Sequence, residues 1–447
     1  MVISPLSEDD TRKLGATLAI ATPVILIKEL FENALDSGAT TVVVLISPNT
    51  VDRIEVRDNG HGIDPSDFDA LGRSGYTSKL KSLHELATVG ARSLGFRGVA
   101  LASINTLAEV TITTRTSSQP VAEVLRLVDG GGIVKEGRAG NPVGTAVCAN
   151  NLFANFPVRQ RSVIKEAHKN LAKIKELLQA YTFARSGTKV AFRVFGKPES
   201  TWCYTAQTGG GVKEAARQLF GHDVASRCSL KTYSADIKEP REQEKTGAGK
   251  SLSFEGFLPH AGADPQKIAG AFFSVDSRPL SPIRGTGKKL LSVFRAHYNQ
   301  FPPGTKEEKA TKGILIRLNI VCPPGSYDVN VEPAKDDVIF VDEEWVIGHF
   351  KQYLLSVYPR KEDDYENEGG RGYTTAGLET PPASSSGPKD TCKPIQDGLW
   401  ICLDLLTAPA RTKTATVATS IQQSSPIIPR VGTRFPRASM RSHHWKG

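Results

Sequence analysis

The sequence predicts an α+β fold, and three local patterns carry this prediction. A helix is expected over Pro23–Asp36, and two strands follow it, over Thr41–Ser47 and Arg53–Asp58. The second strand alternates apolar and charged residues, as a half-buried strand does, and ends in a glycine-bearing turn over Asp58–Ile63. Helix, strand, strand and glycine turn is not the βαβ order of a doubly wound dinucleotide-binding unit, which argues against that class of fold.

The first helix has clear signals at both ends. Pro23 suits the first turn of a helix, because its missing N–H would have no intrahelical acceptor there, and Gly38 suits the position just past the end. Between them, apolar residues recur with helical spacing and are predicted to be buried: Ile27, Leu30, Phe31, Ala34 and Leu35.

Composition and charge exclude several classes of protein. Of the 447 residues, 39% are hydrophobic and 23% are charged, which is typical of a globular chain, and no apolar run reaches the length of a membrane span. The six cysteines form no CxxC pair, which argues against a zinc ribbon and favours a reducing compartment. Residues 411–447 hold seven cations and no acid, so only +2 of the net charge of +9 remains for residues 1–410. DNA binding by the folded part would therefore need a local basic patch.

Three compositional zones are apparent. Residues 1–200 alternate helical and strand patterns and hold most of the glycine-bearing motifs, and residues 201–358 repeat this mixture more loosely. Residues 359–447 are acidic and glycine-rich, then rich in proline and serine, which is the composition of a disordered linker or tail. We therefore expect two folded domains followed by a disordered segment.

The turn after the second strand, Asp58-Asn59-Gly60-x-Gly62, has two interpretations. It can be a simple connection, because Asn-Gly is favoured in turns for backbone reasons. Alternatively, the Asp58 carboxylate accepts a hydrogen bond from the amino group of a base, and the glycines let the backbone approach a flat ring.

Three further segments combine groups suited to phosphate binding. The loop Gly95–Gly98 reads GFRG and leads into an expected helix start over Ala100–Ile104, so its N–H groups can cradle phosphates, although no P-loop pattern is present. The segment Thr77–Lys79 brings together two hydroxyls and an ammonium, and Gly144–Thr145 leads into an apolar strand. Each can also be an ordinary connection between elements.

Glu29 and Asn33 project from the same face of the first helix, because they are four residues apart. An acid and an amide on a helix are usually solvated, but the flanking sequence is apolar on both sides. A buried carboxylate needs a reason, and a general base that orients water, beside an amide oxygen that ligates Mg²⁺, supplies one.

Together, these motifs resemble those of the GHKL ATPases, whose nucleotide-binding domain has the Bergerat fold. Several segments look specifically like the MutL-type DNA mismatch repair proteins, over roughly residues 10–358. They are KELFENALDSGAT, VRDNGHGI, TSK, GFRGVALASI, LFANFPVRQR and DVNVEPAK. The segments ITTRT, FLPHAGAD and FFSVDSRPL are similar to the eukaryotic post-meiotic segregation branch, on its accessory, non-nuclease side.

The resemblance implies a Bergerat-type ATP-binding α/β sandwich over residues 1–200 and a smaller transducer domain, of βαβ type like ribosomal protein S5 domain 2, over 201–358. It implies that Glu29 is the general base, that Asn33 ligates Mg²⁺ and that Lys335 reaches the γ-phosphate of ATP. The residues that it assigns to ATP binding are Asp58, Gly60, Gly62, Ile63, Thr77, Ser78, Lys79, Gly95, Phe96, Arg97, Gly98 and Thr145.

The implied function is that of an ATP-dependent mismatch repair factor. ATP binding and slow hydrolysis would close the N-terminal lid and dimerise the chain on double-stranded DNA. The implied partners are a second MutL-type subunit, giving a heterodimer, and a MutS-type recognition complex; the compartment is the nucleus, with no membrane. Arg159, Arg161, Lys165, Lys169 and Lys173 are candidate DNA contacts, the last three as a stripe on one helix, unless they form only a solvated face.

Two departures keep alternatives open. The family reads Ile-Ala-Ala-Gly-Glu-Val where this chain reads LGATLA over Leu14–Ala19, so an accessory binding subunit with a vestigial ATPase is one alternative. Residues 360–447 are too short and too poor in periodicity for the C-terminal dimerisation domain of full-length relatives, and no DQHAxxE-like nuclease motif is present. Another GHKL member, of topoisomerase or chaperone type, is the remaining alternative, although the acidic metal-binding or long middle domains expected of those classes are absent.

Overall fold

The computed structural model describes residues 3–80, 85, 93–207, 209–235, 251–261, 268–300, 314–331 and 335–359. The chain divides into two units, Met1–Arg371 and Gly372–Gly447. The second unit lies wholly outside the described residues, as does nearly all of the segment 359–447 that was predicted to be disordered.

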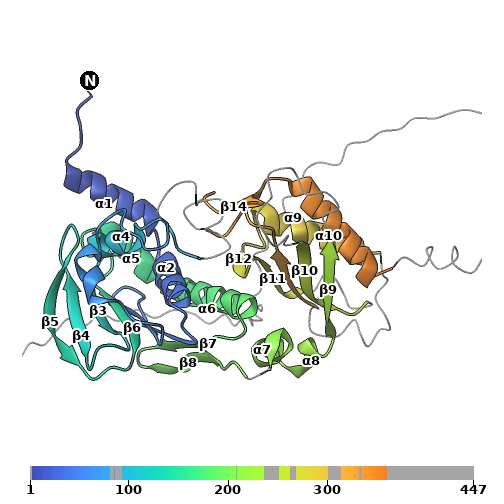
Figure 1. The fold of residues 1–447 in the computed structure, drawn as a ribbon, viewed down its shortest axis with the longest axis horizontal. Helices are drawn as coiled ribbons and strands as arrows, with labels where there is room; N and C mark the ends of the chain where they lie inside the picture. The colour runs from blue at the N-terminus through green and yellow to red at the C-terminus, as the bar shows by residue number, and fades with distance from the viewer. Residues whose placement is uncertain are drawn as a thin grey trace, which may run out of the picture. The chain divides into compact units, whose positions relative to one another are not determined.

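An eight-stranded sheet, with strand order β5-β4-β3-β6-β2-β1-β7-β8, organises the N-terminal part (Figure 1). Neighbouring strands are antiparallel except β1 and β7, which pair in parallel. The strands are β1 (Thr41–Ile46), β2 (Arg53–Asp58), β3 (Glu109–Arg115), β4 (Ala122–Leu127), β5 (Ile133–Ala139), β6 (Gly144–Asn150), β7 (Lys189–Val194) and β8 (Lys197–Tyr204).

Helices pack against this sheet. Helix α2 contacts β1 and β2, α4 contacts β3, and α6 contacts β7 and α2. In Figure 1 these helices and α1 lie on the same side of the strands. The helical segments are α1 (Glu8–Ala19), α2 (Pro23–Asp36), η1 (Pro65–Ala70), α4 (Ala100–Leu107), α5 (Pro157–Lys165) and α6 (Ala167–Ala184).

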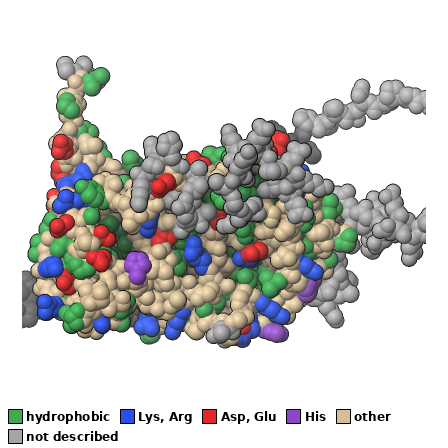
Figure 2. Space-filling view, viewed as in Figure 1, with side chains coloured by type: hydrophobic (Ala, Val, Ile, Leu, Met, Phe, Trp, Pro, Cys, Tyr) green, Lys and Arg blue, Asp and Glu red, His purple; other side chains and the backbone are tan. Residues whose placement is uncertain are grey.

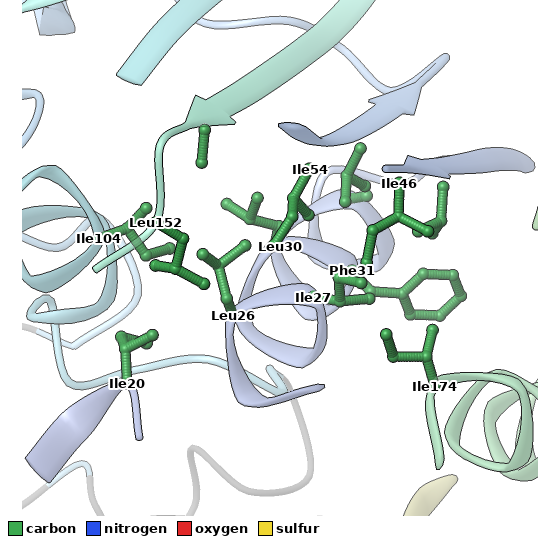
Figure 3. Packing of buried hydrophobic residues seen from close by; sticks show 14 of the residues in the cluster. Ile20, Leu26, Ile27, Leu30, Phe31, Ile46, Ile54, Ile104, Leu152 and Ile174 are labelled. Carbon is green, nitrogen blue, oxygen red and sulfur yellow. The ribbon is translucent and has the colours of Figure 1, made fainter. Parts of the chain in front are cut away.

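Helix α2 confirms the predicted Pro23–Asp36 helix at both ends. The Thr22 side chain caps it by accepting a hydrogen bond from the N–H of Ile25, at 3.3 Å, and Gly38 takes a left-handed φ of 74° beyond its end. Its apolar face is buried against the sheet and α6, where Ile27, Leu30 and Phe31 meet Ile46, Ile54 and Ile174 (Figure 3). Each such side chain contributes roughly 1.5–3 kcal/mol of transfer free energy.

A second, five-stranded sheet has the order β12-β11-β13-β10-β9. Strands β11 and β13 are parallel, and helix α9 lies between them in sequence, which is the predicted βαβ connection. The elements are α7 (Gly211–Phe220), α8 (His222–Ala225), β9 (Cys228–Ala235), β10 (Leu252–Pro259), β11 (Ile268–Val275), β12 (Arg278–Leu280), α9 (Gly285–Tyr298), β13 (Ile314–Val321), β14 (Tyr327–Asp328), β15 (Ile339–Phe340) and α10 (Glu343–Val357).

The two sheets have separate hydrophobic cores. The first core is built on α2 and the strands around it, and the second on β10, β13, α9 and α10. The prediction of a mixed α/β fold with a second, smaller β domain is confirmed. Within the described part of the chain, no single helix has the length and apolar character to cross a membrane; only α1 and α2 counted together, with an 83° bend between them, reach that length and composition.

Candidate functional site

The polar face of α2 carries two buried carboxylates. The side chain of Glu29 is nearly buried and that of Glu32 has no exposed surface, whereas Asn33, one residue further, is exposed. The Nζ atom of Lys335 lies 2.8 Å from the Glu29 carboxylate and 3.6 Å from that of Glu32. Lys335 and Glu29, which are 306 positions apart, are therefore brought together in the structure.

Glu32 is the centre of a charge network that the sequence did not indicate. It accepts hydrogen bonds from the ammonium of Lys28 and from the hydroxyl of Tyr181. Burial alone would raise the pKa of Glu32, but the nearby charges of Lys28, Lys335 and Arg278 outweigh it and lower that pKa to about 2. Glu32 thus remains a carboxylate at neutral pH and holds cations beside the predicted catalytic base.

Asp36, in the last turn of α2, is a second acidic residue that the sequence did not single out. It accepts hydrogen bonds from the N–H groups of Leu94 and Gly95, at 2.9 and 3.0 Å, and lies 2.7 Å from the hydroxyl of Ser93. The ammonium of Lys79 donates to Asp36 at 2.6 Å and to the Oδ1 of Asn33 at 2.8 Å. The two predicted phosphate-binding segments, around Lys79 and Gly95, are therefore both attached to the end of α2.

The other residues of the two predicted phosphate-binding segments, Thr77–Lys79 and Gly95–Gly98, make different kinds of contact. The N–H of Lys79 donates to the hydroxyl of Thr77, at 3.2 Å, whereas no hydrogen bond is described for the side chain of Ser78. Phe96 is buried in the second core, and the ammonium of Lys335 lies 5.7 Å from the centre of its ring. The Arg97 guanidinium donates to Asn330, at 2.9 and 3.1 Å, and Gly98 accepts at its carbonyl from Gly75.

Asp58 forms the other end of the candidate site. Its Oδ1 accepts hydrogen bonds from the N–H groups of Gly60, at 2.8 Å, and Thr145, at 3.3 Å. Burial raises the pKa of Asp58, and the two N–H donors oppose that rise. The N–H of Ile63 donates to the hydroxyl of Thr114, which lies 3.2 Å from that of Thr145. Asp58, Ile63 and Thr145 are thus linked across β2, β3 and β6.

Packing explains why glycines occupy the turn after β2, and the sequence did not indicate this reason. Gly62 has a φ of 77°, and a Cβ there would lie 2.2 Å from the carbonyl oxygen of Arg115. A Cβ at Gly60 would lie 1.9 Å from the hydroxyl of Ser37. Both positions exclude larger residues because the protein's own atoms occupy the space.

One structural prediction about the basic residues was wrong. Lys165, Lys169 and Lys173 do not share one helix, because α5 ends at Lys165 and α6 begins at Ala167. Lys169 and Lys173 remain together on α6, and all three lysines and Arg161 are exposed. The guanidinium of Arg159 donates to the carbonyl of Thr17, at 2.9 Å, and lies over Phe153, which gives it a structural role. Figure 2 shows basic and acidic side chains interspersed on one face of the molecule.

The polar end of α2 offers one side-chain oxygen of the kind that Mg²⁺ takes, that of Asn33. This ion usually takes one or two protein oxygens and completes its shell with water and phosphate oxygens, so it needs no dedicated cage. The exposed Oδ1 of Asn33 offers such an oxygen, but it accepts a hydrogen bond from the ammonium of Lys79, at 2.8 Å, which Mg²⁺ would have to displace. No cluster of three or more potential metal-ligating side chains occurs among the residues that the structure describes.

Comparison with known families gives two matches that cover most of the candidate site. Residues 22–129 match the family of histidine kinase-, DNA gyrase B- and HSP90-like ATPases, and residues 231–358 match the C-terminal domain family of DNA mismatch repair proteins. The first match contains Glu29, Asn33 and Asp58, and the second contains Lys335.

Similar whole proteins are known as well. The chain is 29% identical to the DNA mismatch repair protein PMS1 of Arabidopsis thaliana, over 81% of this chain and 37% of that protein. It is 30% identical to the human PMS1 protein homolog 1, over 78% of this chain and 35% of that protein. The MutL protein of Desulforudis audaxviator is also 30% identical, over 76% of this chain and 54% of that protein.

The chain thus spans between about a third and about half of the length of these relatives. Among solved structures, the N-terminal domain of a DNA repair protein superposes with a TM-score of 0.61 at 23% identity, covering 80% of this chain and all of that one. At this level of identity the similarity concerns the fold alone.

Proposed function

Because the chain belongs to the MutL-type family of DNA mismatch repair proteins and carries that family's GHKL-type ATPase domain, we propose that it binds ATP with Mg²⁺ and hydrolyses it slowly. The single observation that carries this proposal is the meeting of Glu29 and Lys335. A buried base and a buried ammonium lie 2.8 Å apart, beside a glycine loop fixed to the same helix. Such a combination suits phosphoryl transfer, where positioning and charge stabilisation supply most of the catalysis.

Each residue has a distinct role in the proposed reaction. Glu29 accepts a proton from the attacking water, and Lys335 neutralises charge at the γ-phosphate. Mg²⁺, when bound through Asn33, would supply further neutralisation of phosphate charge. Asp58 reads the amino group of adenine, with Gly62 and Ile63 beside the ring. The remaining ATP-binding residues proposed are Gly60, Thr77, Ser78, Lys79, Gly95, Phe96, Arg97, Gly98 and Thr145.

The contact between Lys335 and Glu29 supports slow turnover. The Glu29 oxygen that accepts from the ammonium of Lys335 is occupied by that hydrogen bond and is not free to accept from water. The γ-phosphate competes for the same ammonium, so ATP would release the base by drawing Lys335 away, whereas ADP lacks the competing group. The same contact keeps the vestigial ATPase as a second candidate, in which the pair stays closed and the chain acts as an ATP-binding accessory subunit.

Replacing Lys335 with alanine tests the proposal. We expect the preference for ATP over ADP to fall by about 10–100-fold, because the variant cannot make a charge-assisted hydrogen bond to the γ-phosphate. Calorimetric titration of both nucleotides with Mg²⁺ measures this ratio. Lys289→Ala, which removes an exposed lysine of α9, is the matched control, and thermal melting checks that each variant is folded. An unchanged ratio in folded Lys335→Ala protein would rule out the assigned role, and an absence of nucleotide binding by the unaltered chain would rule out the function.

We also propose the domain limits and partners that follow from this family. Residues 1–200 would form the ATPase domain, 201–358 the transducer domain and 359–447 a linker or tail. ATP-driven lid closure would dimerise the chain with a second MutL-type subunit on double-stranded DNA in the nucleus, in cooperation with a MutS-type complex. The similarity to mismatch repair proteins over both matched regions supports these assignments.

The exposed lysines Lys165, Lys169 and Lys173 remain our candidates for DNA contact, together with Arg161. Changing the three lysines to glutamate in the chain without residues 360–447 should weaken duplex binding at every sequence. The slope of log affinity against log salt should fall by about 0.9 for each phosphate that the variant no longer neutralises. Fluorescence anisotropy over a salt series measures both. If affinity and slope stay the same, these lysines are only a solvated surface, and Lys288, Lys289 and Arg295 become the next positions to change.

A further inference from the structure

The largest fully buried side chain among the described residues is a cation, Arg278, at the start of β12. Its side chain has no exposed surface. Removing a guanidinium from water is costly unless its donors are satisfied and its charge is balanced. Arg278 lies outside the residues to which we assigned catalysis or nucleotide binding, so its burial requires another reason.

Both terminal nitrogens of Arg278 donate to backbone carbonyls of the N-terminal part of the chain, whereas its buried Nε has no hydrogen-bond partner among the described residues. One terminal nitrogen donates to the carbonyl of Leu94, at 3.0 Å, and the other to the carbonyl of Ser93, at 2.8 Å. The two acceptors are consecutive carbonyls, and each accepts from a different terminal nitrogen of the planar guanidinium, whereas an ammonium would have to reach both from one nitrogen. The charge of Arg278 is also one of those that lower the pKa of the buried Glu32 carboxyl.

The same short segment is held from the opposite side by Asp36. Leu94 and Gly95 donate their N–H groups to Asp36, while Ser93 and Leu94 offer their carbonyls to Arg278. Three consecutive residues are therefore fixed between the end of α2 and the start of β12. They lead directly into Phe96, Arg97 and Gly98, the loop assigned to the phosphates.

We propose that Arg278 is a positioning residue that holds Ser93–Gly95 against Asp36 and thereby places the Gly95–Gly98 loop over the triphosphate. This inference rests on the proposed ATP-binding function. It extends that function, because a residue of the second sheet would then hold the phosphate-binding loop in place. This role is separate from the contact that Lys335 makes with Glu29. The contacts that the loop makes with the phosphates therefore depend on this support. The adenine-binding end of the site, at Asp58 on β2, does not depend on it.

Arg278→Lys is the most direct test, because it keeps the charge and removes the bridging geometry. We expect kcat/KM for ATP to fall by about 10–100-fold, since small displacements of positioning groups cost about that much, while the affinity for adenosine, which lacks phosphates, stays within about threefold. Hydrogen exchange should become faster at the N–H groups of Leu94 and Gly95. Arg217→Lys is the matched control, as Arg217 is an exposed arginine of α7 to which no function is assigned.

A second variant distinguishes a specific effect on the segment 93–95 from a general loss of structure. Asp36→Asn weakens the hydrogen bonds that Asp36 makes with this segment and should give the same loss of kcat/KM. Because both residues hold the same segment, the double variant should be little worse than either single variant. Unchanged kcat/KM and unchanged exchange in Arg278→Lys would overturn the inference, as would fully additive losses in the double variant. If the unaltered chain binds no nucleotide, the proposed function fails, and exchange at Leu94 and Gly95 still decides whether Arg278 holds the segment.

Discussion

Replacing Glu29 with alanine will slow ATP hydrolysis by about 10²–10⁴-fold, the usual contribution of a positioned general base, while ATP still binds. The reason is that, in the mechanism proposed above, Glu29 acts on the attacking water and not on the nucleotide. Steady-state phosphate release measures the rate, and calorimetric titration measures binding.

Two further variants make this test specific. Glu29→Gln preserves the size of the side chain and a hydrogen bond to Lys335, yet should hydrolyse as poorly as the alanine variant. Glu166→Ala removes an exposed carboxylate between α5 and α6 and should hydrolyse at the unaltered rate. A Glu29→Gln protein with full activity would show that another group activates the water.

Replacing Asp58 with alanine will remove detectable binding of adenine nucleotides, with a loss of at least about 10²-fold. In the proposed site, the carboxylate accepts a charge-assisted hydrogen bond from the adenine amino group, which is worth about 1.5–3 kcal/mol. Its removal also leaves the N–H groups of Gly60 and Thr145 without their acceptor. Titration with ATP and with ADP should show equal losses, because the adenine is common to both.

The expected contrast with Lys335→Ala makes the Asp58 assignment testable. That lysine variant should lose ATP selectively, whereas Asp58→Ala should lose both nucleotides. Asp52→Ala, just before β2, removes an exposed carboxylate and should bind normally. Retention of ADP binding by folded Asp58→Ala protein would show that the turn after β2 is only a connection between elements.

The parts of the fold that could be predicted are those with strong local signals. Helix α2 begins and ends where Pro23 and Gly38 indicated, because capping preferences and the left-handed glycine act over a few residues. Strand β2 also has the predicted limits, and its alternation of Ile54 and Val56 with charged residues is a local pattern. Such features depend little on distant parts of the chain.

The parts that could not be predicted depend on long-range packing. No proline or glycine interrupts the segment between Pro157 and Ala184, so local rules gave one helix where the structure has two. The roles of Glu32, Asp36 and Arg278 likewise rest on partners that are tens to hundreds of residues away. A single sequence shows the residue types and not which of them meet.

The 306 positions between Glu29 and Lys335 also bear on how the protein is made. At about 5–20 residues per second, a ribosome would need roughly 15 to 60 s to proceed from the first residue to the second. During that interval α2 and the first sheet can form, but the buried carboxylates of Glu29 and Glu32 lack the ammonium of Lys335. A nascent chain would therefore hold an incomplete and poorly charge-balanced site, exposed to chaperones and proteases, until its second domain had left the exit tunnel.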